Sequence, residues 1–260
     1  MPDPKVYGAG EEASMRSALW AIVLLLPALM AGTAGGDAPV LRIGFGTNKP
    51  PYVFEAERRG LEYDIVVGAA HRAGYEVEPV FAPLARLRRM LADHSVDGIT
   101  ITNPQSGDKA CYTQPYIDYH NVAIALASRH LRVDGIADLA RYSVSSFQRS
   151  RDLLGSDYDR MAASNPGYRE EANQVTRNLL LFSGRIDVIV GDRRIIGYFN
   201  KVVAGQVDVT QPVTTYELFQ PIHYSVGFVN PAICTAFDFG LSDLKRSGEY
   251  GRIEQTYRDY

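Results

Sequence analysis

Cysteine and histidine, the residues that most often hold metal ions, are scarce in this sequence. Two cysteines, Cys111 and Cys234, and five histidines occur among 260 residues. Neither residue type shows the spacing of a zinc site, so the sequence predicts no metal site. We assign the histidines to the surface or the core; they are His71, His94, His120, His130 and His223.

An excess of basic charge is also missing. Lys and Arg number 27 against 30 Asp and Glu, which gives a formal net charge of -3. Proteins that bind phosphate backbones usually carry clustered basic residues. Here only short groups occur, such as Arg86, Arg88 and Arg89, which we interpret as a solvated helix face. We therefore expect no nucleic-acid partner.

Catalytic motifs are absent as well. The sequence contains no Gly-x-Ser-x-Gly elbow, no phosphate-binding glycine loop and no His-Glu-x-x-His helix. Three side chains could serve as a general acid or base, namely Glu62, His120 and Glu217, but none lies in a recognisable motif. We therefore expect no catalytic residue and no cofactor.

The N-terminal apolar run, residues 18–30, is shorter than the roughly 20 residues that a membrane span needs. Arg16 precedes this run and small residues follow it at 31–36, which is the three-part layout of a secretory signal. We expect cleavage after Ala34. Residues 1–34 would then form a signal peptide, and the mature protein would enter the periplasm.

Two alternatives stay open at this end of the chain. Met15 could be the true start, because the segment between Met1 and Met15 is acidic and would weaken the positive end of the signal. The apolar run could also remain uncleaved as an anchor. No cysteine follows the run directly, so the sequence predicts no lipid attachment there.

Hydrophobic periodicity predicts strands and helices in alternation. The expected elements begin with a strand at 41–45, a helix from 60, a strand at 76–81, a helix from 83 and a strand at 96–101. Pro50 and Pro51 stop the first strand, and Tyr52 and Phe54 follow in an extended loop that we interpret as contacting a ligand. This order favours a parallel sheet with helices on both faces.

An extended apolar run at 116–127 is interpreted as a crossing into a second lobe, where the pattern repeats. The elements expected there are a strand at 142–146, a helix at 149–154, a polar stretch through 166, a helix at 172–183, a strand at 186–190 and a helix that Asp192 caps. A strand at 222–229 and helices at 232–246 and 249–257 return to the first lobe. We therefore expect lobe 1 at 35–118 and 223–260, and lobe 2 at 119–222.

Seven segments, in this order and spacing, resemble those of bacterial periplasmic solute-binding proteins of the polar amino-acid-binding family, the extracellular solute-binding proteins of family 3. They are GTNKPPYVF at 46–54, GLEYDI at 60–65, VDGITIT at 96–102, YTQPY at 112–116, GIADLARYSV at 135–144, GRIDVIVGD at 184–192 and LKRSGEYGRIEQTY at 244–257. The resemblance implies an α/β fold of the two-lobe, type II periplasmic-binding-protein class. Two crossings join the lobes, and the ligand cleft lies between them.

The resemblance also implies ligand-binding residues. Tyr52 and Phe54 match aromatic positions where a ring covers the ligand, although either ring could belong to the core instead. Thr100 and Thr102 match a segment that offers backbone and hydroxyl groups to a ligand carboxylate. Asp192 matches the carboxylate that receives the ligand ammonium in amino-acid binders, although it could serve only as a helix cap.

One departure from the family pattern concerns the ligand carboxylate. Family members that bind amino acids usually have Thr-Pro-x-Arg after the threonine strand, whereas this chain reads TNPQSGDKACY and has Ser106 near the arginine position. The only cation nearby is Lys109. A fork of the kind that grips a carboxylate is therefore missing from this segment, since no arginine lies between Arg89 and Arg129.

Two explanations of this departure stay open. Arg149 or Arg151 could supply the cation from lobe 2. Alternatively the ligand has no carboxylate there, and Asp192 with the rings of Tyr52, Tyr116 and Tyr119 would suit an amine.

The resemblance implies a monomeric receptor that binds a small polar ligand, an amino acid or related amine, and delivers it to an ABC-type membrane permease. A sensor module that is not coupled to transport, or a small dehydratase-like enzyme on the same scaffold, is the alternative. Cys111 and Cys234 both lie in segments assigned to lobe 1. In an oxidising compartment we expect them to form a disulfide.

Overall fold

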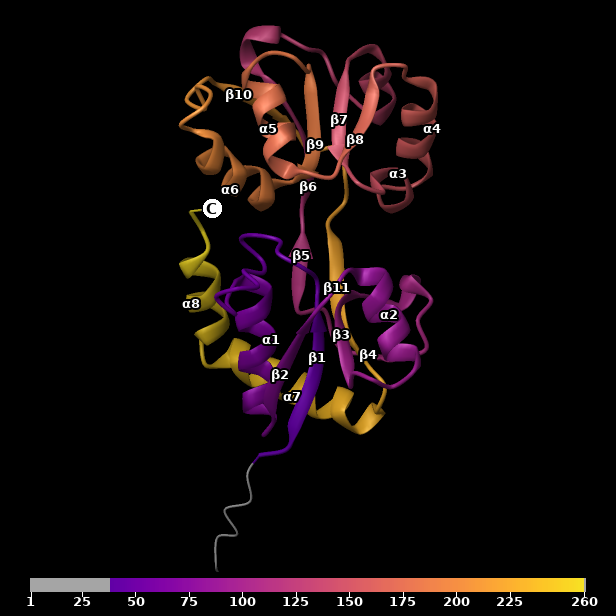
Figure 1. Ribbon diagram of the computed structural model, residues 1–260, viewed down its shortest axis with the longest axis vertical. Helices are drawn as coiled ribbons and strands as arrows, with labels where there is room; N and C mark the ends of the chain where they lie inside the picture. Colours follow the sequence, from indigo (N-terminus) through magenta and orange to yellow (C-terminus); the bar gives the residue numbers. More distant parts are fainter. Residues whose placement is uncertain (1–37, 260) are drawn as a thin grey trace, which may run out of the picture. The chain divides into compact units, whose positions relative to one another are not determined.

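The computed structural model describes residues 38–259 (Figure 1). Residues 38–259 belong to one compact unit. The predicted signal peptide, residues 1–34, lies outside the described residues. Among residues 38–259, no helix has both the length and the apolar character needed to cross a membrane.

The first sheet contains the first three strands of the chain and the strand that returns to them. In spatial order it consists of β2 (Glu76–Phe81), β1 (Val40–Phe45), β3 (Gly98–Thr102), β11 (Ile222–Phe228) and β4 (Cys111–Tyr112), with β5 (Ile117–Tyr119) also pairing with β11. β1 runs parallel to β2 and β3, as the sequence predicts. β11 is antiparallel to its three neighbours, because it re-enters the sheet from the opposite end. We call this sheet and its helices the first lobe.

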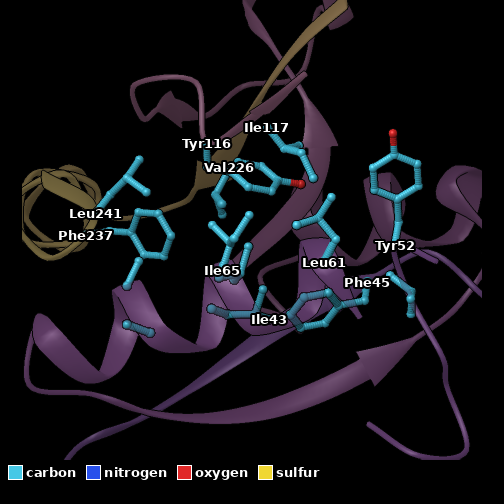
Figure 2. Close-up of a cluster of buried hydrophobic side chains, with 14 of the residues drawn as sticks. Ile43, Phe45, Tyr52, Leu61, Ile65, Tyr116, Ile117, Val226, Phe237 and Leu241 are labelled. Atoms are coloured by element: carbon cyan, nitrogen blue, oxygen red, sulfur yellow. The ribbon is translucent and has the colours of Figure 1, made fainter. Parts of the chain in front are cut away.

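Helices cover the first sheet on both faces. They are α1 (Leu61–Arg72), α2 (Leu84–Ala92), α7 (Pro231–Arg246) and α8 (Glu249–Thr256), with a short 3-10 helix at Pro104–Ser106. Ile43 and Phe45 of β1 and Ile65 of α1 meet Phe237 and Leu241 of α7 in one buried cluster (Figure 2). A second cluster, around Leu87, lies beneath α2.

Glycine allows α1 and α7 to approach closely. A Cβ on Gly240 of α7 would lie 2.1 Å from the carbonyl oxygen of Ala69 in α1, well inside van der Waals contact. The two helices therefore pack backbone against backbone at this point.

The second sheet combines parallel and antiparallel pairs. Its order is β10 (Val213–Tyr216), β6 (Asn121–Leu126), β9 (Val188–Asp192), β7 (Val144–Phe147) and β8 (Tyr168–Glu171). β7 is parallel to β8 and β9, whereas β6 is antiparallel to β9 and β10. The helices here are α3 (Ser150–Leu153), α4 (Ser156–Ser164), α5 (Gln174–Phe182) and α6 (Arg193–Val203), with 3-10 turns at Ala127–Arg129 and Ile136–Arg141. We call this sheet and its helices the second lobe.

Two elements of the second lobe, α4 and β8, were not predicted: α4 falls in the expected polar stretch through 166, and β8 falls between that stretch and the helix expected from 172. α4 is polar in composition, yet it buries Tyr158, Met161 and Ala162 against the sheet. β8 is a four-residue edge strand, mostly polar, whose partner is β7. Both are stabilised by tertiary packing, which a window of local periodicity does not reveal.

The chain crosses between the lobes twice, from β5 to β6 and from β10 to β11. β5 ends at Tyr119 and β11 begins at Ile222, and these two residues pair with each other in the first sheet. The lobe bounds at 118/119 and 222/223 stay a proposal, and sheet membership assigns both Tyr119 and Ile222 to the first lobe.

A disulfide lies within the first lobe. Cys111 on β4 and Cys234 on α7 are bonded to each other, with their Cα atoms 6.1 Å apart. The bond ties the edge of the first sheet to a helix that covers it.

Candidate functional site

A tyrosine of the first lobe contacts an aspartate of the second. The Tyr52 hydroxyl donates to both carboxylate oxygens of Asp192, at 3.1 Å each. Tyr52 is held in place by the start of α1, where the Glu62 N–H donates to the Tyr52 carbonyl at 3.0 Å. Gly60 makes room for this approach: its φ is +137°, and a Cβ there would lie 2.2 Å from the Tyr52 carbonyl oxygen.

Asp192 ends β9 and caps α6, as the sequence predicts. Its Oδ1 accepts hydrogen bonds from the N–H groups of Arg194 and Ile195, at 3.0 and 3.1 Å. Its Oδ2 accepts from the His120 N–H in the first crossing, at 2.9 Å. Burial raises the pKa of Asp192 and these hydrogen bonds lower it, with a net rise. The carboxylate thus joins the second lobe, the crossing and Tyr52.

Glu62, on the first turn of α1, is a second buried carboxylate. Its side chain is fully buried, and its Oε2 accepts a hydrogen bond from the Tyr119 hydroxyl at 2.9 Å. Burial raises the pKa of Glu62, while Lys49 lowers it. Neither its Oε1 nor the Thr100 hydroxyl has a hydrogen-bond partner among residues 38–259. The Thr100 hydroxyl also helps to lower the pKa of Glu62, so the two groups lie next to each other.

Lys49 supplies the positive charge of this region. Its Nζ lies 5.2 Å from the centre of the Tyr119 ring, a cation–π contact, and the side chain is partly buried. Burial lowers the pKa of Lys49, whereas Glu62 and Asp192 raise it. Lys49 was not predicted; the cation expected near the missing arginine was Lys109, whose side chain is exposed. The signal for Lys49 is its place directly before the two prolines of the ligand-contacting loop.

Tyrosine rings enclose the two carboxylates. Tyr52 stacks on Tyr119 with ring centres 4.0 Å apart, and Tyr224 meets Tyr119 edge-on at 5.1 Å. Tyr116 is buried, and its hydroxyl accepts from the Ile101 N–H at 3.4 Å. Burial raises the pKa of Tyr224 to about 12. We define the tyrosine cluster as Tyr52, Tyr116, Tyr119 and Tyr224.

Two of the predicted residues have other partners in the structure. The Phe54 ring meets Tyr198 of α6 edge-on at 5.6 Å. The Thr102 hydroxyl donates to Asp108 at 2.9 Å, and Asp108 in turn pairs with Arg88 at 2.7 Å.

Arg88, expected on a solvated helix face, instead reaches the segment where the family arginine is missing. Its guanidinium donates to the Ser106 carbonyl and pairs with Asp108. Its role there is to hold the loop, because its charge is already matched by an aspartate.

Neither arginine proposed to supply a cation from the second lobe joins the tyrosine cluster. Arg149 pairs with Asp152 at 3.1 Å and Arg151 with Asp159 at 2.6 Å, and their side chains are 63% and 45% exposed. Each of these exposed guanidinium groups already has an aspartate partner and contact with water, so the structure does not support Arg151 as a ligand residue. The buried arginine of this lobe is Arg177, 1% exposed, which the sequence analysis did not single out.

The side chains considered for acid–base catalysis do not assemble into a catalytic group. His120 and Glu217 are exposed, and Glu217 pairs with Arg193. Among residues 38–259 no group of three His, Cys, Asp or Glu side chains could hold a metal ion. Glu62 and Asp192 thus lie as two buried carboxylates among the rings of the tyrosine cluster.

Known structures share this fold. They include an ancestral arginine-binding protein bound to glutamine, 20% identical with a TM-score of 0.63 over 85% of this chain and 98% of that one. A histidine kinase sensor domain with similarity to periplasmic binding proteins is 16% identical, with a TM-score of 0.67 over 85% and 96% of the two chains. The ancestral amino-acid-binding protein AncCDT-1, a precursor of cyclohexadienyl dehydratase, is 18% identical, with a TM-score of 0.64 over 84% and 95%. These likenesses establish the fold alone.

A family model covers nearly all of the described chain. The model of the bacterial extracellular solute-binding proteins, family 3, matches residues 41–259, whereas no curated protein matches the sequence. With its two sheets joined by two crossings, the chain therefore belongs to the bacterial extracellular solute-binding proteins of family 3.

Proposed function

We propose that this protein is an exported receptor for a small polar ligand that carries an amine. One observation supports this most strongly: two buried carboxylates, Glu62 and Asp192, lie among tyrosines, and Lys49 is the cation beside Glu62. Glu62 Oε1 has no hydrogen-bond partner within residues 38–259, so it can accept a bond from a ligand. An ammonium group there would gain a charge-assisted hydrogen bond, about 1.5–3 kcal/mol, and contact with tyrosine faces.

The proposed mechanism is reversible capture, in which no covalent bond changes. The ligand amine first meets Glu62, Thr100 and the tyrosine cluster of the first lobe, and it takes over from Lys49 as the cation beside Glu62. The bonds between Tyr52 and Asp192, already made in this structure, would then hold the second lobe closed over the ligand. Because Asp192 also bonds the His120 N–H in the crossing, closure and ligand contact involve the same carboxylate.

Further residues of the site follow the family resemblance. Phe54 and Tyr116 would cover the ligand with their rings, and Thr102 would offer its backbone beside Thr100. Arg151 is left out of this set, because its charge is matched by Asp159.

Export and delivery belong to the same proposal. Residues 1–34 would direct the chain to the periplasm and be removed, and the mature monomer in its closed shape would be recognised by an ABC-type permease. A sensor would use the same binding step without a permease. Uptake of a radiolabelled ligand by cells with and without the gene separates transport from sensing.

The experiment is a thermal-shift screen of the purified protein with amines, followed by calorimetry. A ligand that binds only the folded state raises the melting temperature. We expect a shift with at least one of putrescine, cadaverine, L-lysine and L-arginine at millimolar concentration. Glu62→Gln should weaken that binding about tenfold or more, because the charge is lost while the shape is kept.

Glu217→Gln is the matched control, since Glu217 is exposed in the second lobe and should leave affinity unchanged. Absence of any shift across the amines, or equal affinity of wild type and Glu62→Gln, would refute the proposed function.

A further inference from the structure

The second lobe contains an unusual number of buried polar atoms without hydrogen-bond partners. Within residues 38–259 these are Ser145 Oγ, Gln174 Oε1, Asn178 Oδ1, and Nε and Nη2 of Arg177. Buried polar groups in proteins are nearly always hydrogen-bonded, so such a concentration calls for an explanation. For the donors Nε and Nη2 of Arg177, a ligand that supplies acceptors is one.

Arg177 is the charged member of this set. It is 1% exposed and extends from α5 to β9, where its Nη1 donates to the Val190 carbonyl at 3.1 Å. A Cβ on Gly191 would lie 2.8 Å from that Nη1. The absence of a side chain at Gly191 therefore makes room for the guanidinium directly beside Asp192.

No carboxylate forms an ion pair with Arg177 within residues 38–259, although 11 other arginines there do. Burial lowers the pKa of Arg177 to about 10, while Tyr158 and Asp192 raise it. Leaving a buried charge without a partner is costly. A fold retains such a group where a function needs it.

The guanidinium lies at the carboxyl ends of two adjacent parallel strands, β7 and β9. Ligands of open α/β sheets bind at this edge. Ser145 and Ser146 are on β7, and the Ser146 hydroxyl is near enough to Tyr158 to lower its pKa against the effect of burial. The next residue after Gly191 is Asp192, which Tyr52 of the first lobe contacts. The group therefore adjoins the proposed amine site.

We propose that Arg177 binds a carboxylate of the same ligand whose amine binds at Glu62. The planar fork of a guanidinium matches the two oxygens of a carboxylate, and its Nε and Nη2 are the two atoms without partners. This inference rests on the proposed function. It restricts the ligand to molecules that carry both an amine and a carboxylate. Arg177 of α5 then supplies the cation that is missing from the segment after β3.

The test compares pairs of compounds that differ in the anionic group. The pairs are γ-aminobutyrate with butylamine and L-lysine with cadaverine, measured by thermal shift and calorimetry on the wild-type protein. We expect the acid of at least one pair to bind about tenfold or more tightly than its amine. Equal binding within both pairs would overturn the inference while leaving an amine receptor intact.

Three variants assign the effect to Arg177. Arg177→Met should abolish the preference for the acid, and Arg177→Lys, which keeps the charge but loses the fork, should reduce it. Arg151→Met is the control and should keep the preference for the acid, because Arg151 is exposed and pairs with Asp159. The ligand-free melting temperature of Arg177→Met should equal or exceed that of wild type, since an unpaired buried charge is removed. A folded Arg177→Met protein that still prefers the acid would overturn the inference.

A further measurement separates this inference from the proposed function. Acetate and sulfate are compared with chloride at matched ionic strength, without any amine. Acetate should raise the melting temperature of wild type more than that of Arg177→Met. An equal response of the two proteins refutes the anion site even if amines bind, whereas an acetate effect without amine binding refutes the amine receptor alone.

Discussion

Substitution of Asp192 tests whether one carboxylate both caps a helix and connects the lobes. Asp192→Ala removes the acceptor for two N–H groups at the start of α6, which costs about 1 kcal/mol. It also leaves the buried Tyr52 hydroxyl without its acceptor, which costs about 1–3 kcal/mol. We expect the free energy of unfolding to fall by about 2–4 kcal/mol.

Asp192→Asn should be milder. Asparagine caps helices as well as aspartate does, so its oxygen can keep the bonds to Arg194 and Ile195. Its amide replaces the oxygen that accepts from the His120 N–H at 2.9 Å, where donor then faces donor. We expect a loss of about 1–2 kcal/mol, together with a loss of amine affinity of tenfold or more, because the charge is gone.

The assay is urea unfolding at neutral pH for stability and calorimetry with an amine for affinity. Asp152→Asn is the control, because Asp152 is 61% exposed and should change stability by less than about 0.5 kcal/mol. Two results would refute the reasoning. One is an alanine variant as stable as wild type, and the other is an asparagine variant as unstable as the alanine variant.

Three further predictions concern pH, the disulfide and helix packing. Burial raises the pKa of Glu62. As the pH is lowered, Glu62 should therefore become protonated at a higher pH than an ordinary glutamate, and amine binding should weaken. The same protonation should add stability to the ligand-free protein. Both effects should be smaller in Glu62→Gln, where only the raised pKa of Asp192 still contributes, when affinity and urea unfolding are followed against pH. The unreduced, unfolded protein should contain no free thiol, and two free thiols in a thiol titration would contradict this. Replacing Cys111 and Cys234 by alanine should lower the free energy of unfolding by about 2–5 kcal/mol, since the bond closes a separation of 123 residues. Gly240→Ala should lower the free energy of unfolding in urea by about 1–3 kcal/mol, because its Cβ would meet the Ala69 carbonyl. The control is Gly251→Ala in α8, whose Cβ would meet nothing within 4 Å and which should be neutral or stabilising. Equal effects of the two substitutions would refute the packing argument.

The sequence was most informative where a local motif has a local structural consequence. Alternating apolar residues predicted β1 and β2, and the aspartate after an apolar strand predicted the cap of α6. The antiparallel course of β11 was not predicted, because strand direction is decided by the path between lobes and not by the residues of the strand.

The charged residues of the site were harder to predict. An arginine on a helix looks the same in sequence whether it is exposed, as Arg151 is, or buried, as Arg177 is. The difference arises from Gly191, whose missing side chain leaves space for one guanidinium and which lies 14 residues further along the chain. Lys49 was missed for a similar reason, because its neighbour Glu62 reaches it only after the loop folds onto α1.

The stacked pair of Tyr52 and Tyr119 gives the protein an optical signal of its own. The single tryptophan of the chain is Trp20, within the predicted signal peptide, so residues 38–259 contain none. In a chain that lacks residues 1–34, ultraviolet emission therefore comes from tyrosine alone. A ligand that parts these rings, or withdraws the carboxylate from the Tyr52 hydroxyl, would change that emission, and subtracting the spectrum of Tyr52→Phe isolates the contribution of this ring without any attached label.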